Sequence, residues 1–358
     1  MLSDSPIAER AALAQRLLRF RREIAEKVTE EFLLLYPDWV TRYGELARLR
    51  GIEDAIFHQD FLAAAIESGA ARAYGEYLQW TAGVLESRGI APSFLHRNVE
   101  QISSELQSRL APPLAAEVAE FIKSALKSTV DDPPAGRVGV PGPDGKPPEL
   151  ASVQALYLQA ILHGQRQAAT GIAVETVRRG HSVVDVYADV LQESMYQVGR
   201  MWEANRITVA QEHMATAITQ HVIAHLYPLI KSTRPQKGRM VITGVEGEQH
   251  QVGPNMVADV LESAGWDVQF LGTNTPAAGV LKAIDDHRAD VLGISATMLF
   301  NLPGVRRLIA AARAIPGRQV RVILGGCAFR AAPDLYKELG AAGVALDVRA
   351  ALRLAETL

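Results

Sequence analysis

The chain has 358 residues, 48% of them hydrophobic and 22% charged, which is typical of a folded protein and excludes a disordered or fibrous one. Its net charge of -3 argues against a protein whose main task is to bind nucleic acid. No apolar run reaches about 18 residues, so the sequence predicts no membrane span, and no apolar stretch near the start predicts a signal peptide. The single cysteine, Cys327, excludes an internal disulfide and suits a reducing compartment, so we expect a cytoplasmic protein.

Residues 1–128 carry apolar side chains at helical spacing and show no alternation typical of strands. We therefore expect an all-helical first domain. Residues 129–148 read TVDDPPAGRVGVPGPDGKPP, where proline and glycine replace the periodic apolar residues. This composition predicts a linker between domains.

Residues 149–233 return to long helical patterns, at 150–179, 183–202 and 209–230, separated by short polar breaks. The first pattern is long enough to hold two helices. Ser182 and Thr208 stand where N-caps belong. Short connections between antiparallel neighbours predict a four-helix bundle.

Residues 234–358 alternate short β-rich runs with helical runs, beginning with RMVITGV and followed by DVQFLGT, DVLGISAT, VRVILGG and GVALD. Five strands with helical crossovers predict a doubly wound, five-stranded parallel sheet of flavodoxin-like order. Ligands bind such sheets at the carboxyl ends of the strands, so the loops after the first, third and fourth strands are the places to look for chemistry.

The loop after the first strand contains Glu248, His250 and Gly253 in the pattern E-x-H-x-x-G. An imidazole on a loop can ligate a metal, and a nearby carboxylate can hold its other ring nitrogen. The alternative is an ordinary surface histidine beside a helix start. Small residues follow the other two strands and would let a flat ligand approach the backbone: Ser295, Thr297, Gly325 and Gly326.

These motifs, in this order on this predicted fold, resemble the cobalamin-binding domain of methionine synthase and its relatives. The resemblance implies that His250 is the lower axial ligand of cobalt and that Glu248 is its partner. It also implies that Gly253 contacts the cofactor and that its tail lies in a pocket lined by Ser295, Thr297, Gly325 and Gly326. The family more often has aspartate at the first motif position, so the reach of the longer glutamate to His250 is an open point.

In the preceding helical bundle, Trp202 is followed ten residues later by Glu212 and His213. This spacing resembles the adenosylcobalamin photoreceptors, in which the tryptophan lies near the adenosyl group and the Glu-His pair contacts it. The alternative is a core tryptophan with two exposed polar residues. Those photoreceptors commonly have histidine directly after the tryptophan, where this chain has Glu203. After light, His213 is then the nearest candidate upper ligand, or water takes the position.

The stretch FHQDFLAAAIESGAARAYGEYLQWTAGVLESRGI in the first domain resembles a globin-type sensor domain. A globin-like domain joined to a cobalamin module resembles the photocobilins, which add a bilin. Because the only cysteine lies outside this domain, a bilin such as biliverdin would bind noncovalently. Candidate contacts are His58, Tyr74, Tyr77, Trp80 and His96. Haem is a competing ligand, and aromatic residues at helical spacing are also typical of a core.

The resemblance as a whole implies a light-sensing, non-enzymatic photoreceptor that uses adenosylcobalamin. Photolysis of the cobalt-carbon bond would change cobalt ligation and then assembly or partner contacts. We expect a homo-oligomer with light-dependent assembly and a signalling partner in trans, and neither nucleic acid nor membrane as a partner. The alternative is a corrinoid methyl-carrier protein of a methyltransferase system. A mutase subunit is less favoured because no substrate barrel is present in these residues.

Overall fold

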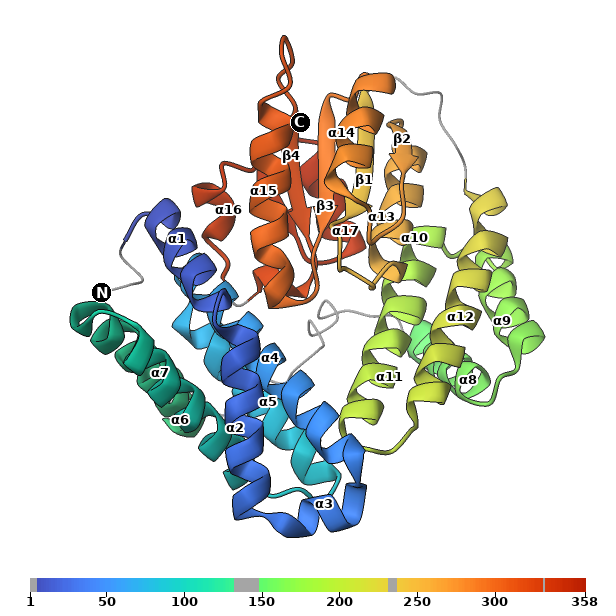
Figure 1. The fold of residues 1–358 in the computed structure, drawn as a ribbon. Helices are drawn as coiled ribbons and strands as arrows, with labels where there is room; N and C mark the ends of the chain where they lie inside the picture. The colour runs from blue at the N-terminus through green and yellow to red at the C-terminus, as the bar shows by residue number, and fades with distance from the viewer. Residues whose placement is uncertain (1–4, 132–147, 231–236, 331) are drawn as a thin grey trace. The chain divides into compact units, whose positions relative to one another are not determined.

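The computed structural model describes residues 5–131, 148–230, 237–330 and 332–358 (Figure 1). It divides into two compact units, residues 1–134 and 135–358. Almost all of the expected linker, 132–147, lies outside the described residues. The domain boundaries at 128, 148 and 233 remain predictions.

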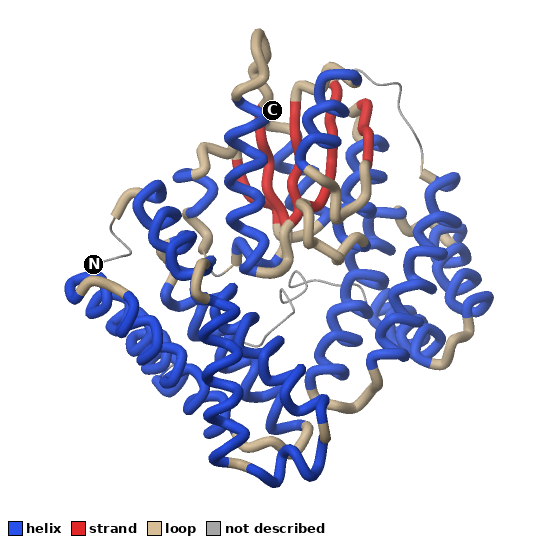
Figure 2. The backbone as a smooth tube through the Cα atoms, in the orientation of Figure 1, coloured by secondary structure: helices blue, strands red, loops and turns tan. Residues whose placement is uncertain are grey.

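The first unit consists of helices and loops, as the sequence predicts (Figure 2). Proline at the first helical turn starts α3 and α6, where its missing N–H has no helical partner to lose. Gly69, with φ of +69°, ends α4 in the left-handed conformation that favours glycine. The likeness to globins stays a prediction. The helices are α1 (Ile7–Leu18), α2 (Arg21–Leu35), α3 (Pro37–Tyr43), α4 (Glu45–Ser68), α5 (Ala71–Ser87), α6 (Pro92–Arg109) and α7 (Pro112–Asp131).

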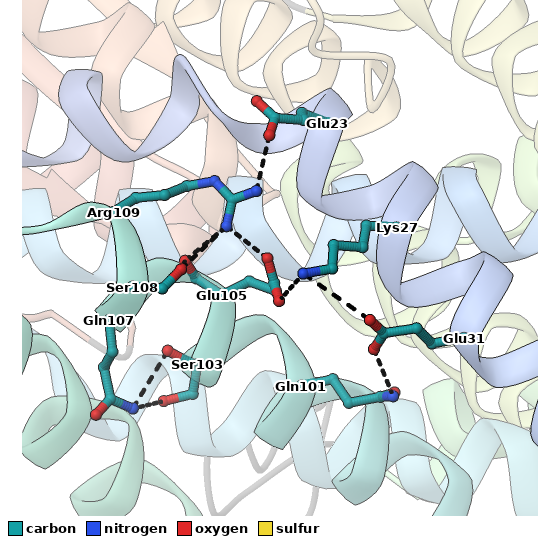
Figure 3. A network of polar contacts seen from close by, with 9 residues as sticks. All are labelled: Glu23, Lys27, Glu31, Gln101, Ser103, Glu105, Gln107, Ser108 and Arg109. Atoms are coloured by element: carbon teal, nitrogen blue, oxygen red, sulfur yellow. Dashed lines mark hydrogen bonds and ion pairs between the residues drawn. The ribbon is translucent and has the colours of Figure 1, made fainter.

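A charged network joins α2 to α6 (Figure 3). Lys27 Nζ lies 2.6 Å from Glu105 Oε1, and Arg109 Nη2 lies 2.8 Å from Glu23 Oε1. Burial raises the pKa of Glu105, but hydrogen bonds from Lys27 and Arg109 outweigh that effect and the net pKa is below its ordinary value. Glu105 is therefore ionised and holds both cations.

The second unit begins with a helical cap. Its helices match the predicted ranges, including two helices in the first long pattern. Ser182 Oγ accepts a hydrogen bond from the Asp185 backbone N–H, and Thr208 forms a capping box with Gln211. One feature was not predicted, a π-helical turn, η2, between α10 and α11. The elements are α8 (Pro148–Leu162), α9 (Arg166–Arg178), α10 (Val183–Asp185), η2 (Val186–Gln192), α11 (Glu193–Glu203), α12 (Val209–Leu226) and η3 (Tyr227–Leu229).

The α/β part that follows contains the predicted parallel sheet, with strand order β2-β1-β3-β4-β5. Its strands are β1 (Arg239–Gly244), β2 (Asp267–Phe270), β3 (Val291–Ser295), β4 (Arg321–Gly325) and β5 (Gly343–Ala345). Its helices are α13 (Val252–Ser263), α14 (Ala277–Asp286), η4 (Leu299–Asn301), α15 (Leu302–Arg313), η5 (Cys327–Phe329), α16 (Leu335–Glu338) and α17 (Val348–Ala355). The order confirms the flavodoxin-like prediction.

The register of the sheet places the candidate loops side by side. Gly244 pairs with Ser295, and Ser295 pairs with Gly325, so β1, β3 and β4 end at the same level. The chain leaves β1 toward β2 on one side and enters β3 on the other. This is the switch point at which parallel sheets bind ligands.

The cap and the α/β part are joined by buried polar contacts at η2. Arg349 of α17 donates to both carboxylate oxygens of Asp189, at 2.9 and 2.7 Å, and to Asp185 at 2.6 Å. Beside it, Tyr187 Oη donates to Asp259 Oδ2 of α13 at 2.7 Å. We call these five residues the η2 clamp.

Candidate functional site

Glu248 lies at the centre of the polar contacts at the carboxyl edge of the sheet. Its side chain is fully buried. Oε1 accepts from the His250 backbone N–H at 2.9 Å and lies 2.5 Å from His250 Nδ1. Oε2 accepts from the Thr297 backbone N–H at 2.6 Å and from Asn301 Nδ2 at 3.0 Å. The carboxylate therefore ties the loop after β1 to the loop after β3.

The contact with Glu248 fixes which ring nitrogen of His250 carries the hydrogen. Burial raises the pKa of Glu248, but hydrogen bonds from His250 and Thr297 and the charge of His250 bring the net pKa below its ordinary value. An ionised carboxylate only accepts, so Nδ1 of His250 carries the hydrogen. When the imidazole is neutral, this tautomer leaves the lone pair on Nε2, on a side chain that is 55% exposed. This is the arrangement that a histidine ligand to a metal requires.

Gly244 makes room for the longer glutamate. A Cβ at Gly244 would lie 2.7 Å from Thr273 Cγ2 and 3.1 Å from Glu248 Cγ. The absence of a side chain at the end of β1 lets the Glu248 methylenes pack there. The extra methylene therefore does not prevent contact with His250.

The small residues at the other strand ends lie where the sequence predicted them. Ser295 is buried at the end of β3, and Thr297 is half-buried just beyond it. Gly325 ends β4. Gly326 has φ of +98°, and a Cβ there would lie 2.2 Å from the Ala296 carbonyl oxygen. Only glycine fits this turn.

Gly253 and Arg330 show how the site suits a large ligand. A Cβ at Gly253, in the first turn of α13, would meet nothing within 4 Å, so there is open space beside it. Arg330 follows η5, and its Nη2 is buried without a hydrogen-bond partner among the described residues. Open space, an unused donor and the free Nε2 of His250 together fit a bulky cofactor that has a metal and oxygen acceptors.

The cap candidates lie at the facing ends of α11 and α12. Trp202 is half-buried and packs against the cap core. Glu212 Oε2 lies 2.5 Å from His213 Nδ1, and Glu212 Oε1 accepts from Thr216 Oγ1 at 3.0 Å. The His213 side chain is 75% exposed. As at His250, a carboxylate holds Nδ1 and leaves Nε2 free.

In the first unit the structure brings only some of the candidate residues together. Tyr74 and Tyr77 are buried on α5, and His58 Nδ1 lies 2.7 Å from Tyr77 Oη. The Tyr74 hydroxyl is buried without a hydrogen-bond partner in the part of the chain that is described. The Trp80 ring lies 6.3 Å from that of Tyr77, whereas His96 is exposed on α6 and lies outside this cluster.

Sequence reasoning missed Asn301, Arg330 and Gly244. Asn301 is recognisable only once β1 and β3 are paired, because its contact, Glu248, lies on the loop after β1. Gly244 stands only four residues before Glu248, but its role depends on the packing of Thr273 and Glu248 at the end of β1. Arg330 stands in the otherwise apolar run CAFRAA. A lone cation in such a run was the available signal.

Within 5–131, 148–230, 237–330 and 332–358, no three histidine, cysteine or acidic side chains converge on a metal-sized position. In the same ranges no helix is long and apolar enough to cross a membrane. Cys327 is half-buried, and burial raises the pKa of its thiol, which does not suit a nucleophile.

Comparison with known proteins gives two family matches and several relatives. Residues 238–355 and 153–227 each match a model of a B12 binding domain. Dimethylamine corrinoid protein 1 of Methanosarcina mazei is 28% identical over 196 residues, covering 52% of this chain and 90% of the relative. Dimethylamine corrinoid protein 3 of the same organism is 30% identical over 135 residues, covering 37% and 81%.

Among solved structures, the monomethylamine corrinoid protein of Methanosarcina barkeri is similar with a TM-score of 0.52 and 22% identity. The match covers 58% of this chain and 99% of that one. At this identity the likeness shows a shared fold.

Proposed function

Because the chain belongs to the family of corrinoid proteins with B12-binding domains, we propose that it binds cobalamin at the carboxyl edge of the sheet and acts as the methyl carrier of a methyltransferase system. The contact between Glu248 and His250 is the observation that supports this most directly. Cobalamin, when bound, supplies a cobalt centre that can accept and release a methyl group. The carrier itself is not an enzyme in this proposal.

In this proposal each residue of the site has a specific task. His250 presents Nε2 as the lower axial ligand, and Glu248 holds Nδ1–H so that the ring cannot turn away. The backbone of Thr297 and the amide of Asn301 keep the Glu248 carboxylate fixed. The tail of the cofactor would pass the small residues that end β3 and β4: Ser295, Gly325 and Gly326.

The test is titration of the apoprotein with methylcobalamin, followed by absorption spectroscopy. In the His250→Ala variant we expect weaker binding and a spectrum that returns toward free, base-on cobalamin. Glu248→Gln should keep binding but weaken it by about 10- to 100-fold. His163→Ala, an exposed histidine at the end of α8, is the matched control. An unchanged spectrum and affinity in His250→Ala would contradict the assignment.

A second function, light sensing with adenosylcobalamin, is favoured by the cap. Trp202 lies at the end of α11 and the Glu212–His213 pair in the first turns of α12, and His213, whose Nδ1 is held by Glu212, would offer Nε2 to cobalt. A sensor should bind adenosylcobalamin more tightly than methylcobalamin. Its spectrum and its oligomeric state should also change on illumination. Tighter binding of methylcobalamin, with methyl transfer to a thiol acceptor, would favour the carrier.

The light-sensing proposal extends to the first unit, with biliverdin as a noncovalent second chromophore. The unpartnered Tyr74 hydroxyl, beside Tyr77 and Trp80, is the feature that supports it. Titration of the full chain with biliverdin and with haem tests this. A red-shifted, structured band that denaturation removes is expected for the bilin, and a Soret band would identify haem instead. If neither binds, the unit serves packing or a partner.

A further inference from the structure

Arg330 has a buried donor that the described protein does not use. Its Nη2 has no hydrogen-bond partner in the described residues, and none of the described ion pairs contains it. A guanidinium stays charged at all ordinary pH values, so its N–H groups always need hydrogen-bond acceptors. A buried donor that makes no hydrogen bond lowers the stability of the folded protein, because it has lost its contacts with water. Such a group is expected where a ligand completes it.

The backbone places Arg330 at the candidate site. The tight turn at Gly326 brings η5 against β3, where the Ala328 backbone N–H donates to the Ala296 carbonyl at 3.2 Å. The Arg330 backbone N–H then donates to the Cys327 carbonyl at 3.1 Å, which folds the chain back over the end of β4. Arg330 is thus held by the same turn that only glycine can make.

The charge of Arg330 acts on groups of the cap and of the turn after β4. Burial raises the pKa of Tyr196 on α11 to about 12, and the positive charge of Arg330 acts against that rise. Burial likewise raises the pKa of the Cys327 thiol, again opposed by Arg330. Its charge therefore reaches both the cap helix that bears Trp202 and the turn after β4.

We propose that Arg330 binds the phosphodiester in the nucleotide tail of cobalamin, and this inference rests on the proposed function. A cation with a buried N–H that has no partner gains most from an anionic oxygen, and the phosphodiester is the anionic group of this cofactor. The planar guanidinium suits a phosphate better than it suits a neutral amide carbonyl. Arg330 would then recognise the tail, while His250 recognises the metal.

The experiment compares cobalamin with cobinamide, which has the same corrin ring but lacks the nucleotide tail. Arg330→Met should weaken cobalamin binding by about 10- to 100-fold and change cobinamide binding by less than about twofold. Arg330→Lys keeps the positive charge but lacks the planar pair of N–H groups of the guanidinium, and it should recover part of the cobalamin affinity. Arg321→Met is the matched control, because Arg321 is exposed at the opposite end of the same strand.

The unfolding temperature of the apoprotein distinguishes a role of Arg330 in stability from a role in ligand binding. Since Nη2 has no partner there, Arg330→Met should leave the unfolding temperature of the apoprotein unchanged or raised. The increase in that temperature on adding cobalamin should shrink. A variant whose apoprotein unfolds earlier would overturn the proposal, because Arg330 would then be supporting the fold.

The only cysteine gives an independent readout. Cobalamin should slow alkylation of Cys327 more than cobinamide does in the wild type, and the two should protect equally in Arg330→Met. Equal loss of affinity for both ligands, or no loss for either, would overturn the role of Arg330 and leave the proposed function intact. A wild-type chain that binds neither ligand would overturn both.

Discussion

Gly326 has no room for a side chain. Gly326→Ala would force a Cβ into the Ala296 carbonyl at a positive φ, so we expect a loss of about 2–4 kcal/mol in the free energy of unfolding. Gly253→Ala is the matched control, because the space there is open and alanine is the better helix former. Urea denaturation of both apoproteins measures the difference. Equal stability of the two variants would contradict the turn geometry.

His58 makes the first unit sensitive to acid. Burial lowers its pKa from 6.5 to about 4. Between pH 4 and 6.5, His58 therefore binds a proton in the unfolded chain but not in the folded one. The stabilisation is present above pH 6.5 and is lost as the pH falls toward 4. Between pH 7.5 and 5.0 this single group accounts for about 2 kcal/mol. The protection of α4 and α5 amides from hydrogen exchange should fall accordingly.

The variant His58→Gln isolates this effect from the other titrating groups. Glutamine can still accept from the Tyr77 hydroxyl, but it does not titrate. Its amide protection should therefore depend less on pH than that of the wild type. The same dependence in both proteins would show that another group is responsible.

For single residues, the sequence predicted contacts between residues close together in the chain and missed contacts between residues far apart in it. Glu248 and His250 are two residues apart, so their pairing follows from the motif. Asn301 reaches Glu248 across 53 positions, and Nη2 of Arg330 has no hydrogen-bond partner among the described residues that could have revealed it. Pairing of the strands is what brings these groups together.

Among the elements, the η2 clamp decides how the cap is attached. Arg349→Met would leave the Asp189 carboxylate buried without its cation, since the Asp189 side chain is only 5% exposed. We expect a loss of about 2–3 kcal/mol, below the range for fully buried pairs because Arg349 is itself 26% exposed. Thermal unfolding and hydrogen exchange at η2 and α11 measure it.

Arg353→Met, on the exposed face of the same helix, controls for the lost charge and should change stability by less than about 0.5 kcal/mol. The double variant Arg349→Met, Asp189→Asn should recover part of the loss, because the charge that remains without its partner, Asp185, is 40% exposed rather than buried. Additive losses would show that the two side chains act independently.

The elements themselves could largely be predicted from periodicity. All five strands and the cap helices lie where the patterns place them, because β-rich runs and helical runs alternate cleanly. The π-helical turn at Val186–Gln192 could not be predicted, since six consecutive residues of it are buried and leave no periodic pattern from which its pitch could be read. Its buried tyrosine and aspartate are explained only by α13 and α17, which come much later in the chain.

At the scale of the whole molecule, the division into two units predicts separable behaviour. Residues 148–358 contain the cap, the sheet, the η2 clamp and the Glu248–His250 contact. A fragment of these residues should fold and bind cobalamin with an affinity within about threefold of the full chain. Circular dichroism and titration test this. Loss of binding in a folded fragment would show that the first unit contributes to the site.

The η2 clamp also has a consequence for the order in which the protein is made. Asp189 leaves the ribosome 160 residues before Arg349, its partner. At about 5–20 residues per second, about 8 to 30 s pass before Arg349 is made, and until then the Asp189 carboxylate has no counter-ion from this helix. The contact between the cap and α17 can therefore form only after α17 has been synthesised. Ribosome pausing before residue 349 would prolong the stage at which a partly folded chain is exposed to chaperones and proteases.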